Sequence, residues 1–195
     1  MNFREKLKEF NESENFWVGL LRDAIFVVVV VTIFASISQL TLGLWTPMVA
    51  VESGSMIPHI NIGDIIFIQS IERTEIITFD EGRTTNYKAF DEFGDVVLYK
   101  PLGKTDATPI IHRAMYYVDV GEPMWDNGPP APHAGYITKG DNKKTNPGYD
   151  QQGNISPHAP VKKEWIIGVA RFQRIPWLGC ISLIPRGNFA CLIPQ

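Results

Sequence analysis

Residues 24–44 constrain the fold most, because this stretch of 21 residues carries no charged side chain and 15 of its residues are apolar. A helix of that length rises about 30 Å, which matches the hydrocarbon thickness of a bilayer. The five consecutive valines at 27–31 are poor formers of a soluble helix. A cleavable signal peptide has a shorter apolar stretch, of about 7–15 residues, followed by small residues. The stretch therefore predicts a retained transmembrane helix over 24–44.

Basic residues flank this span unevenly. Four precede it, namely Arg4, Lys6, Lys8 and Arg22, whereas no Lys or Arg occurs in residues 45–72. Because positive residues stay on the cytoplasmic side, the N-terminus is expected in the cytoplasm and the larger C-terminal part outside it. Residues 1–23 mix charged and aromatic side chains, which predicts a short amphipathic segment on the cytoplasmic face.

The pattern changes after the span to short apolar runs bounded by Gly, Asp, Asn and Pro. Runs rich in Val, Ile, Tyr and Phe predict strands at 65–69, 96–100, 110–118, 135–139 and 165–174. We therefore expect a mostly β domain over 45–174, a sandwich or barrel. The polar stretch 72–94 and the proline-rich stretch 121–133 fit this poorly and are expected to be excursions from the β core.

The C-terminal segment, 175–195, is apolar but is interrupted by Pro176, Pro185 and Arg186. It is too broken to span a membrane. We expect it to pack on the core or to lie at the membrane surface.

Composition excludes several classes of protein. A formal charge of -3 gives no basic surface for nucleic acid, so no nucleic-acid partner is expected. The two cysteines, Cys180 and Cys191, make neither a disulfide framework nor a structural zinc site, and packing explains them. No metal and no cofactor are expected.

Three short segments carry residues suited to chemistry. Ser53, Gly54 and Ser55 predict a tight turn that exposes a hydroxyl and free backbone amides. His112 begins a strong strand pattern, and Asp141 follows another strand within Gly-Asp-Asn. Taken singly, each has an ordinary explanation as a turn or a structural histidine.

The order of these segments resembles type I signal peptidase. The resemblance covers about residues 51–171 and rests on five boxes: Ser53-Gly54-Ser55-Met56-x-Pro58, Gly63-Asp64, Gly94-Asp95-Val96-Val97, Ile111-His112-Arg113 and Thr138-Lys139-Gly140-Asp141-Asn142. His112 stands where bacterial relatives carry a lysine. That matches the histidine-using branch of the endoplasmic reticulum and of archaea.

The resemblance implies a role for each matched residue. Ser55 is the nucleophile and His112 the general base, while the Ser55 N–H and the Ser53 hydroxyl stabilise the oxyanion. Asp141 orients or charge-stabilises His112, and Asp150 resembles a second acidic position, at a longer spacing than the family pattern has. A serine hydroxyl needs an adjacent base, and histidine, with an ordinary pKa of about 6.5, serves near neutral pH.

The activity implied is removal of signal peptides from translocated preproteins, with the lipid bilayer and accessory subunits or the translocation machinery as further partners. The short tail and the 72–94 excursion favour an archaeal cell membrane, with the endoplasmic reticulum as the alternative. Two other interpretations stay open. One is a membrane serine protease with a Ser55–Lys100 dyad, and the other is a non-catalytic, membrane-anchored β domain that binds a partner.

Overall fold

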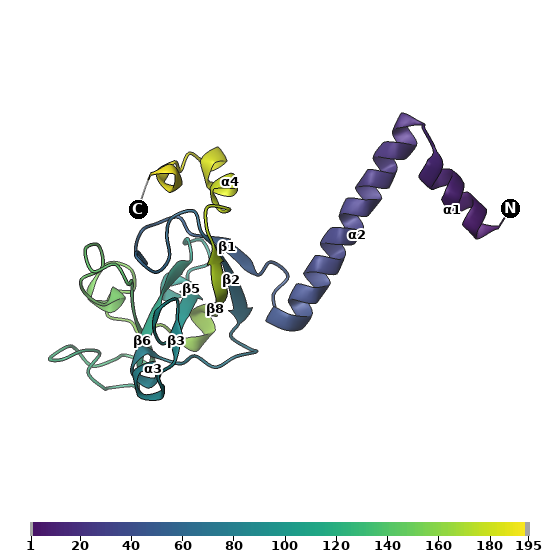
Figure 1. Cartoon of the computed structure of the whole chain (residues 1–195). Helices are drawn as coiled ribbons and strands as arrows, with labels where there is room; N and C mark the ends of the chain where they lie inside the picture. Colours follow the sequence, from purple (N-terminus) through teal and green to yellow (C-terminus); the bar gives the residue numbers. More distant parts are fainter. Residues whose placement is uncertain (1, 194–195) are drawn as a thin grey trace. The chain divides into compact units, whose positions relative to one another are not determined.

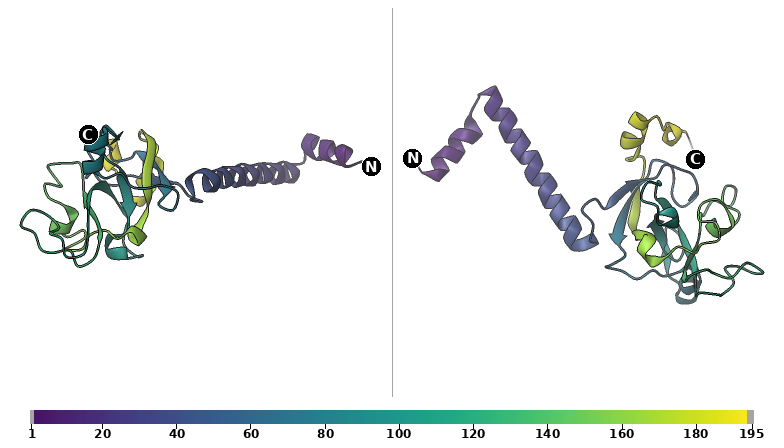
Figure 2. Two further views of the ribbon diagram at one scale, coloured as in Figure 1. Left: turned by 90° about the horizontal axis from the view of Figure 1, so that it is seen from below. Right: turned by 180° about the vertical axis from the view of Figure 1, so that it is seen from behind.

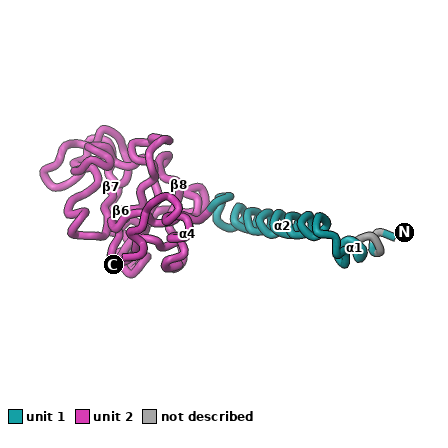
Figure 3. Tube along the Cα trace, turned by 90° about the horizontal axis from the view of Figure 1, so that it is seen from above, with its two compact units in different colours: residues 1–46 teal, residues 47–195 magenta. Residues whose placement is uncertain are grey.

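The structure is a computed structural model that describes residues 2–193. The chain divides into two compact units, residues 1–46 and 47–195, which Figure 3 shows in different colours. Each unit is described by itself below.

The first unit holds two helices, α1 (Phe3–Glu12) and α2 (Phe16–Leu42). Asn15 caps the start of α2 by accepting a hydrogen bond from the Trp17 N–H, and Gly43 ends it in the left-handed conformation that glycine adopts without strain. Within the described residues, α2 is the one helix long and apolar enough to cross a membrane, by length and composition. The predicted boundary between residues 23 and 24 falls inside α2, so the division into a cytoplasmic segment and a span stays a prediction.

The second unit is built on a six-stranded antiparallel sheet with the strand order β1-β2-β8-β5-β6-β7. The strands are β1 (Met48–Ala50), β2 (Ile65–Ser70), β5 (Val96–Tyr99), β6 (Ile110–Val118), β7 (Gly135–Lys139) and β8 (Ile166–Ile175). All five predicted strands are present, each with ends within one residue of the prediction. The mostly β fold class is therefore confirmed.

Residues 72–94 lie outside this sheet, as expected, but they contain structure that the sequence analysis did not predict. Helix α3 (Phe79–Thr85) begins at a capping box in which Thr78 and Glu81 bond reciprocally. A separate two-stranded sheet follows, made of β3 (Lys88–Ala89) and β4 (Glu92–Phe93). Short 3₁₀ turns occur elsewhere in the unit, at Pro101–Gly103, Asp150–Gln152, Lys163–Trp165, Ile184–Arg186 and Ala190–Leu192.

The main core lies against the central strands β5, β6 and β8. Its buried members include Val97, Tyr99, Ala114 and Val169. Burial of this apolar surface is the main stabilising term for a sheet of this kind. It also fixes strand β6, which carries the predicted general base.

The C-terminal segment packs on the sheet end through a small cluster formed by Cys180, Leu183 and Cys191 against Ala50 and Ile62. Cys180 and Cys191 form a disulfide, with Cα atoms 5.9 Å apart, which the sequence analysis did not predict. The helix of this segment, α4 (Cys180–Leu183), and helix α3 lie at opposite ends of the second unit (Figures 1 and 2). How residues 175–195 meet a membrane stays a prediction.

Candidate active site

Ser53, Ser55 and His112 line one cavity of about 670 Å³ in the second unit. The two serines come from the loop between β1 and β2, and His112 comes from β6. Residues far apart in the sequence complete the walls, among them Asn146 and the C-terminal Arg186. The fold thus brings the predicted nucleophile and the predicted base to a single cleft.

The loop that carries Ser55 is closed at its base by backbone hydrogen bonds. The Val51 N–H donates to the Asp64 carbonyl and the Gly63 N–H donates to the Val51 carbonyl, both at 2.9 Å. Within the loop, the Oγ atoms of Ser53 and Ser55 are 3.3 Å apart. The Ser53 hydroxyl is therefore close to the atom that would attack a substrate.

The same loop is held from the far side by the Gly-Asp-Asn segment. Asn142 donates from Nδ2 to the Gly54 carbonyl at 2.7 Å and from its backbone N–H to the Ser55 carbonyl at 2.8 Å. A Cβ atom at Gly140 would lie 2.7 Å from that Ser55 carbonyl oxygen, so only glycine fits there. The Gly-Asp-Asn segment thus holds the Ser55 loop in place.

His112 is bonded to Asp150. The His112 side chain is only 2% exposed, and its Nδ1 lies 2.7 Å from Asp150 Oδ2. The same carboxylate oxygen accepts from the Thr138 hydroxyl at 2.7 Å and from the Tyr99 hydroxyl at 2.8 Å. Asp150 opens the 3₁₀ turn Asp150–Gln152 and is itself 3% exposed.

This network keeps Asp150 ionised. Burial alone would raise the pKa of Asp150, but the hydrogen bond and charge interaction with His112 and the two hydroxyl donors outweigh burial, and the pKa is lowered. Burial, followed by the nearby Asp150 charge, raises the pKa of Tyr99, so its hydroxyl stays a donor. Because a carboxylate only accepts hydrogen bonds, Nδ1 of His112 is the donor in this contact, and in a neutral ring Nε2 would be the nitrogen with the lone pair.

Asp141, predicted to orient His112, instead binds Arg113. The Arg113 guanidinium donates to both Asp141 oxygens, from Nε at 2.9 Å and from Nη2 at 2.6 Å. Adjacent residues of a strand point to opposite faces, so His112 and Arg113 meet different carboxylates. Asp141 also lies 2.7 Å from Nδ1 of His59, four residues after Ser55. Of the two candidate carboxylates, Asp150 is the one in contact with His112.

His59 and Asp141 line a different cavity, of about 730 Å³, and Ser55 is not among the residues that line it. Lys100, the alternative base, precedes the 3₁₀ turn after β5 and does not line the cleft of Ser55. The remaining histidines contact tryptophan rings: His133 meets Trp165 edge-on, and His158 lies tilted beside Trp125. Among the described histidines, His112 is the one that shares a cavity with Ser55.

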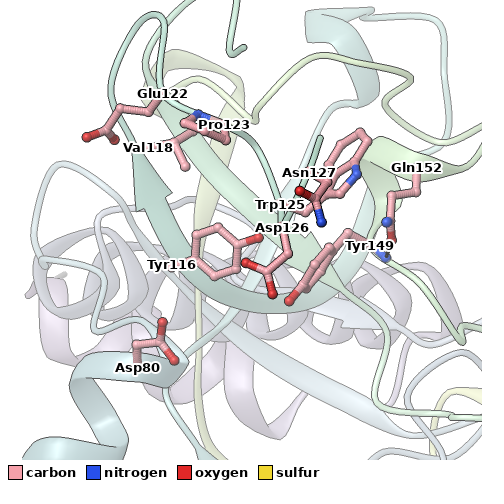
Figure 4. A pocket seen from close by; sticks show the side chains of 10 residues that line it. All are labelled: Asp80, Tyr116, Val118, Glu122, Pro123, Trp125, Asp126, Asn127, Tyr149 and Gln152. Atoms are coloured by element: carbon pink, nitrogen blue, oxygen red, sulfur yellow. Dashed lines mark hydrogen bonds between the residues drawn. The ribbon is translucent and has the colours of Figure 1, made fainter. Parts of the chain in front are cut away.

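A further cavity, of about 720 Å³, forms where the two excursions meet (Figure 4). Asp80 of α3 lies at one edge, and Asp126 of the proline-rich stretch lies between Tyr116 and Tyr149. None of the predicted site residues lines this cavity. In the described part of the chain, no group of three or more His, Cys, Asp or Glu side chains is arranged to hold a metal ion.

Comparison with known proteins finds relatives of one kind. No family model matches it. Signal peptidase complex catalytic subunit SEC11C from Homo sapiens and its counterpart from Mus musculus are each 27% identical to it over 191 residues, which covers 95% of this chain and 82% of each relative.

The chain is therefore homologous to signal peptidase catalytic subunits, and the resemblance found in the sequence is confirmed. The homology supports a peptidase that removes signal peptides. It spans the apolar helix and the β-rich unit together, because the match covers nearly the whole chain.

Proposed function

We propose that this protein is a membrane-bound serine endopeptidase that removes signal peptides from preproteins by a Ser55–His112 mechanism. One observation carries the proposal. Ser55 and His112 line the same cleft, and His112 is bonded through Nδ1 to a buried, ionised Asp150. That is the relation of base and orienting acid that serine catalysis needs.

The proposed chemistry has two halves. His112 Nε2 takes the Ser55 hydroxyl proton as Oγ attacks the carbonyl carbon of the scissile bond, and the resulting imidazolium gives the proton to the leaving amine. Water then attacks the acyl-enzyme, with His112 again accepting a proton and returning it to Ser55 Oγ. Asp150 holds the imidazole ring in place and stabilises its charged form in both halves.

The oxyanion of each tetrahedral intermediate is assigned to the Ser55 N–H and the Ser53 hydroxyl. The 3.3 Å separation of the two Oγ atoms supports this, because a donor beside the nucleophile is beside the attacked carbonyl. Asp141 is assigned a positioning role, since its contacts are Arg113 and His59.

The membrane part of the proposal rests on α2 and on charge. We assign α2 to the bilayer, residues before it to the cytoplasm and the β-rich unit to the outside. The disulfide between Cys180 and Cys191 supports this orientation, because disulfides persist in oxidising compartments.

The preference for an archaeal membrane over the endoplasmic reticulum stays a prediction. The names of the relatives describe subunits of a complex, which supports accessory subunits as partners.

Cleavage of an internally quenched peptide, with an apolar run followed by Ala-x-Ala, tests the proposal on the full chain in detergent. We expect Ser55→Ala and His112→Ala to abolish cleavage, whereas Lys100→Met and His59→Gln keep it. Cleavage that survives His112→Ala but not Lys100→Met would support the Lys100 dyad. A folded parent protein with no activity on any preprotein would support the binding domain.

Topology has its own test. In sealed membrane vesicles of known orientation, an added protease is expected to reach the β-rich unit only from the extracytoplasmic side. A β-rich unit that is digested from the cytoplasmic side would overturn the orientation and the function together, since signal peptides are presented for cleavage outside the cytoplasm.

A further inference from the structure

The disulfide-closed segment Cys180–Cys191 reaches the cleft that holds Ser55 and His112. Arg186 and Asn188 of this segment line that cavity. The sequence predicts that this segment packs on the core or lies at the membrane surface, and none of the five motif boxes of the resemblance falls in it. Its presence in the cleft wall therefore needs a separate explanation.

The segment holds Glu52, three residues before Ser55. Asn188 donates from Nδ2 to the Glu52 carbonyl at 3.1 Å, and Arg186 Nη1 lies 3.4 Å from Glu52 Oε1. The ion pair is exposed at both ends and contributes little. The hydrogen bond from Asn188 is the contact that positions the loop, because it fixes the backbone of Glu52, three residues before the proposed nucleophile.

The disulfide holds the base of the same loop. A Cβ atom at Gly63 would lie 2.6 Å from Cys180 Sγ and 2.7 Å from Cys191 Cβ, so the bond packs directly on this glycine. The Gly63 carbonyl accepts from the Gly179 N–H at 2.8 Å, and its N–H donates to Val51. The segment thus contacts the Ser55 loop at Gly63, where the loop ends, and at Glu52, where it begins.

We propose that Asn188 is a positioning residue for Ser55 and that the disulfide-closed segment is one wall of the peptide-binding cleft. This rests on the proposed function, since it concerns the same nucleophile. The nucleophilic serine must be aligned with both a base and a carbonyl carbon. The reaction rate therefore falls steeply when the loop that carries the serine shifts by about 1 Å. Fixing Glu52 reduces that freedom.

Asn188→Asp is the matched variant. The Oδ1 atom of Asn188 accepts from the Ala190 N–H at 3.1 Å, and an aspartate keeps that acceptor while it loses the donor to Glu52. We expect kcat for the quenched peptide to fall about fivefold, the effect of one neutral hydrogen bond, with KM changed less. The added negative charge is controlled by repeating the measurement at high salt, which screens charge but does not restore a donor.

Ser182→Ala is the control within the segment, because in the described contacts the Ser182 hydroxyl donates only to the carbonyl of Gly179, the residue just before the segment. It is expected to leave kcat unchanged. Thermal unfolding is measured for every variant, with kcat taken well below the unfolding midpoint. A purely structural role of Asn188 would lower the midpoint and leave kcat intact, whereas positioning lowers kcat and leaves the pH dependence of kcat unchanged.

Reduction of the parent gives a second measurement that does not depend on the variant folding. Dithiothreitol is expected to lower kcat of the parent and to leave a Cys180→Ser/Cys191→Ser protein unaffected. The proposal is overturned if the folded Asn188→Asp protein has the kcat of the untreated parent. Where that variant does not fold, the proposal is overturned if the reduced parent has that same kcat. Failure of the proposed function looks different, because Ser55→Ala would then retain cleavage.

Discussion

Asp150→Asn removes one negative charge from the buried network and leaves the shape of the side chain nearly unchanged. Asp150 Oδ2 accepts three hydrogen bonds, from His112, Thr138 and Tyr99, at 2.7 to 2.8 Å. An amide cannot serve all three donors equally. If its NH₂ faces His112, Nδ1 must accept, the proton moves to Nε2, and the ring can no longer act as a base.

The size of the effect follows from the contacts. The equivalent change in Ser–His–Asp enzymes lowers kcat by about 10⁴-fold. Here two hydroxyl donors remain that favour an amide oxygen in the Oδ2 position, so some molecules keep the active tautomer. We therefore expect a loss of about 10³- to 10⁴-fold, or roughly 4–5.5 kcal/mol in the activation free energy.

Stability gives a second readout with a definite sign. Because the pKa of Asp150 is lowered in the folded protein, ionised Asp150 stabilises the fold above the unfolded-state pKa of about 3.9, and this contribution is lost as pH falls through the lower folded pKa. The asparagine variant has no such group. Urea unfolding at about pH 7 and at about pH 3 should show a smaller difference between these conditions for the variant than for the parent.

Asp141→Asn is the matched comparison, because it makes the same chemical change at the other candidate carboxylate. Arg113 is 1% exposed and would lose a bidentate partner, which typically costs about 3–5 kcal/mol of stability. Four carbonyl groups that accept from Arg113 Nη1 remain, so the lower end of that range is expected.

Single-turnover cleavage and urea unfolding are measured on the parent and on both variants. A folded Asp150→Asn protein with kcat within tenfold of the parent would refute the reasoning, as would an Asp141→Asn protein with the larger loss of rate and unchanged stability.

Three further predictions follow from single contacts. Ser53→Ala should lower kcat by about 10²- to 10³-fold, the effect of one oxyanion donor, with little change in KM; steady-state cleavage checks this. Gly140→Ala should lower kcat by at least about tenfold, because the new methyl group meets the Ser55 carbonyl oxygen, while circular dichroism shows a retained fold. The Cys180→Ser/Cys191→Ser protein should lose on the order of 3 kcal/mol in the free energy of unfolding relative to the oxidised parent, measured by urea titration, since the bond closes a loop with a separation of 11 residues.

The five long strands were predictable because each is a run of β-branched and aromatic residues between turn residues. Strand β1 has three residues and no such pattern, so it emerges only from pairing with β2. Helix α3 carries a start signal in its sequence. Thr78 and Glu81 form the Ser/Thr-x-x-Glu pattern of a capping box.

The order of motifs indicates which residues could form a site but not how they pair. Ser55 and His112 are proposed from that order, whereas the carboxylate that contacts His112 depends on where the loop after β7 returns to the sheet. The disulfide was missed for a similar reason. A pair of cysteines indicates a bond only when the fold brings their Cα atoms near enough, here to 5.9 Å.

Strand alternation explains why two adjacent residues have separate tasks. His112 pairs across the sheet with Val97, and Tyr99 lies on the same face of β5 two residues on, so its hydroxyl reaches the carboxylate that binds His112. Arg113 projects to the other face, where Asp141 receives it. Asn142 comes next in the chain and holds the Ser55 loop. The β6–β7 pair therefore links the proposed base to the proposed nucleophile. One face of β6 carries the imidazole, and the other anchors the segment that bonds to the Ser55 loop.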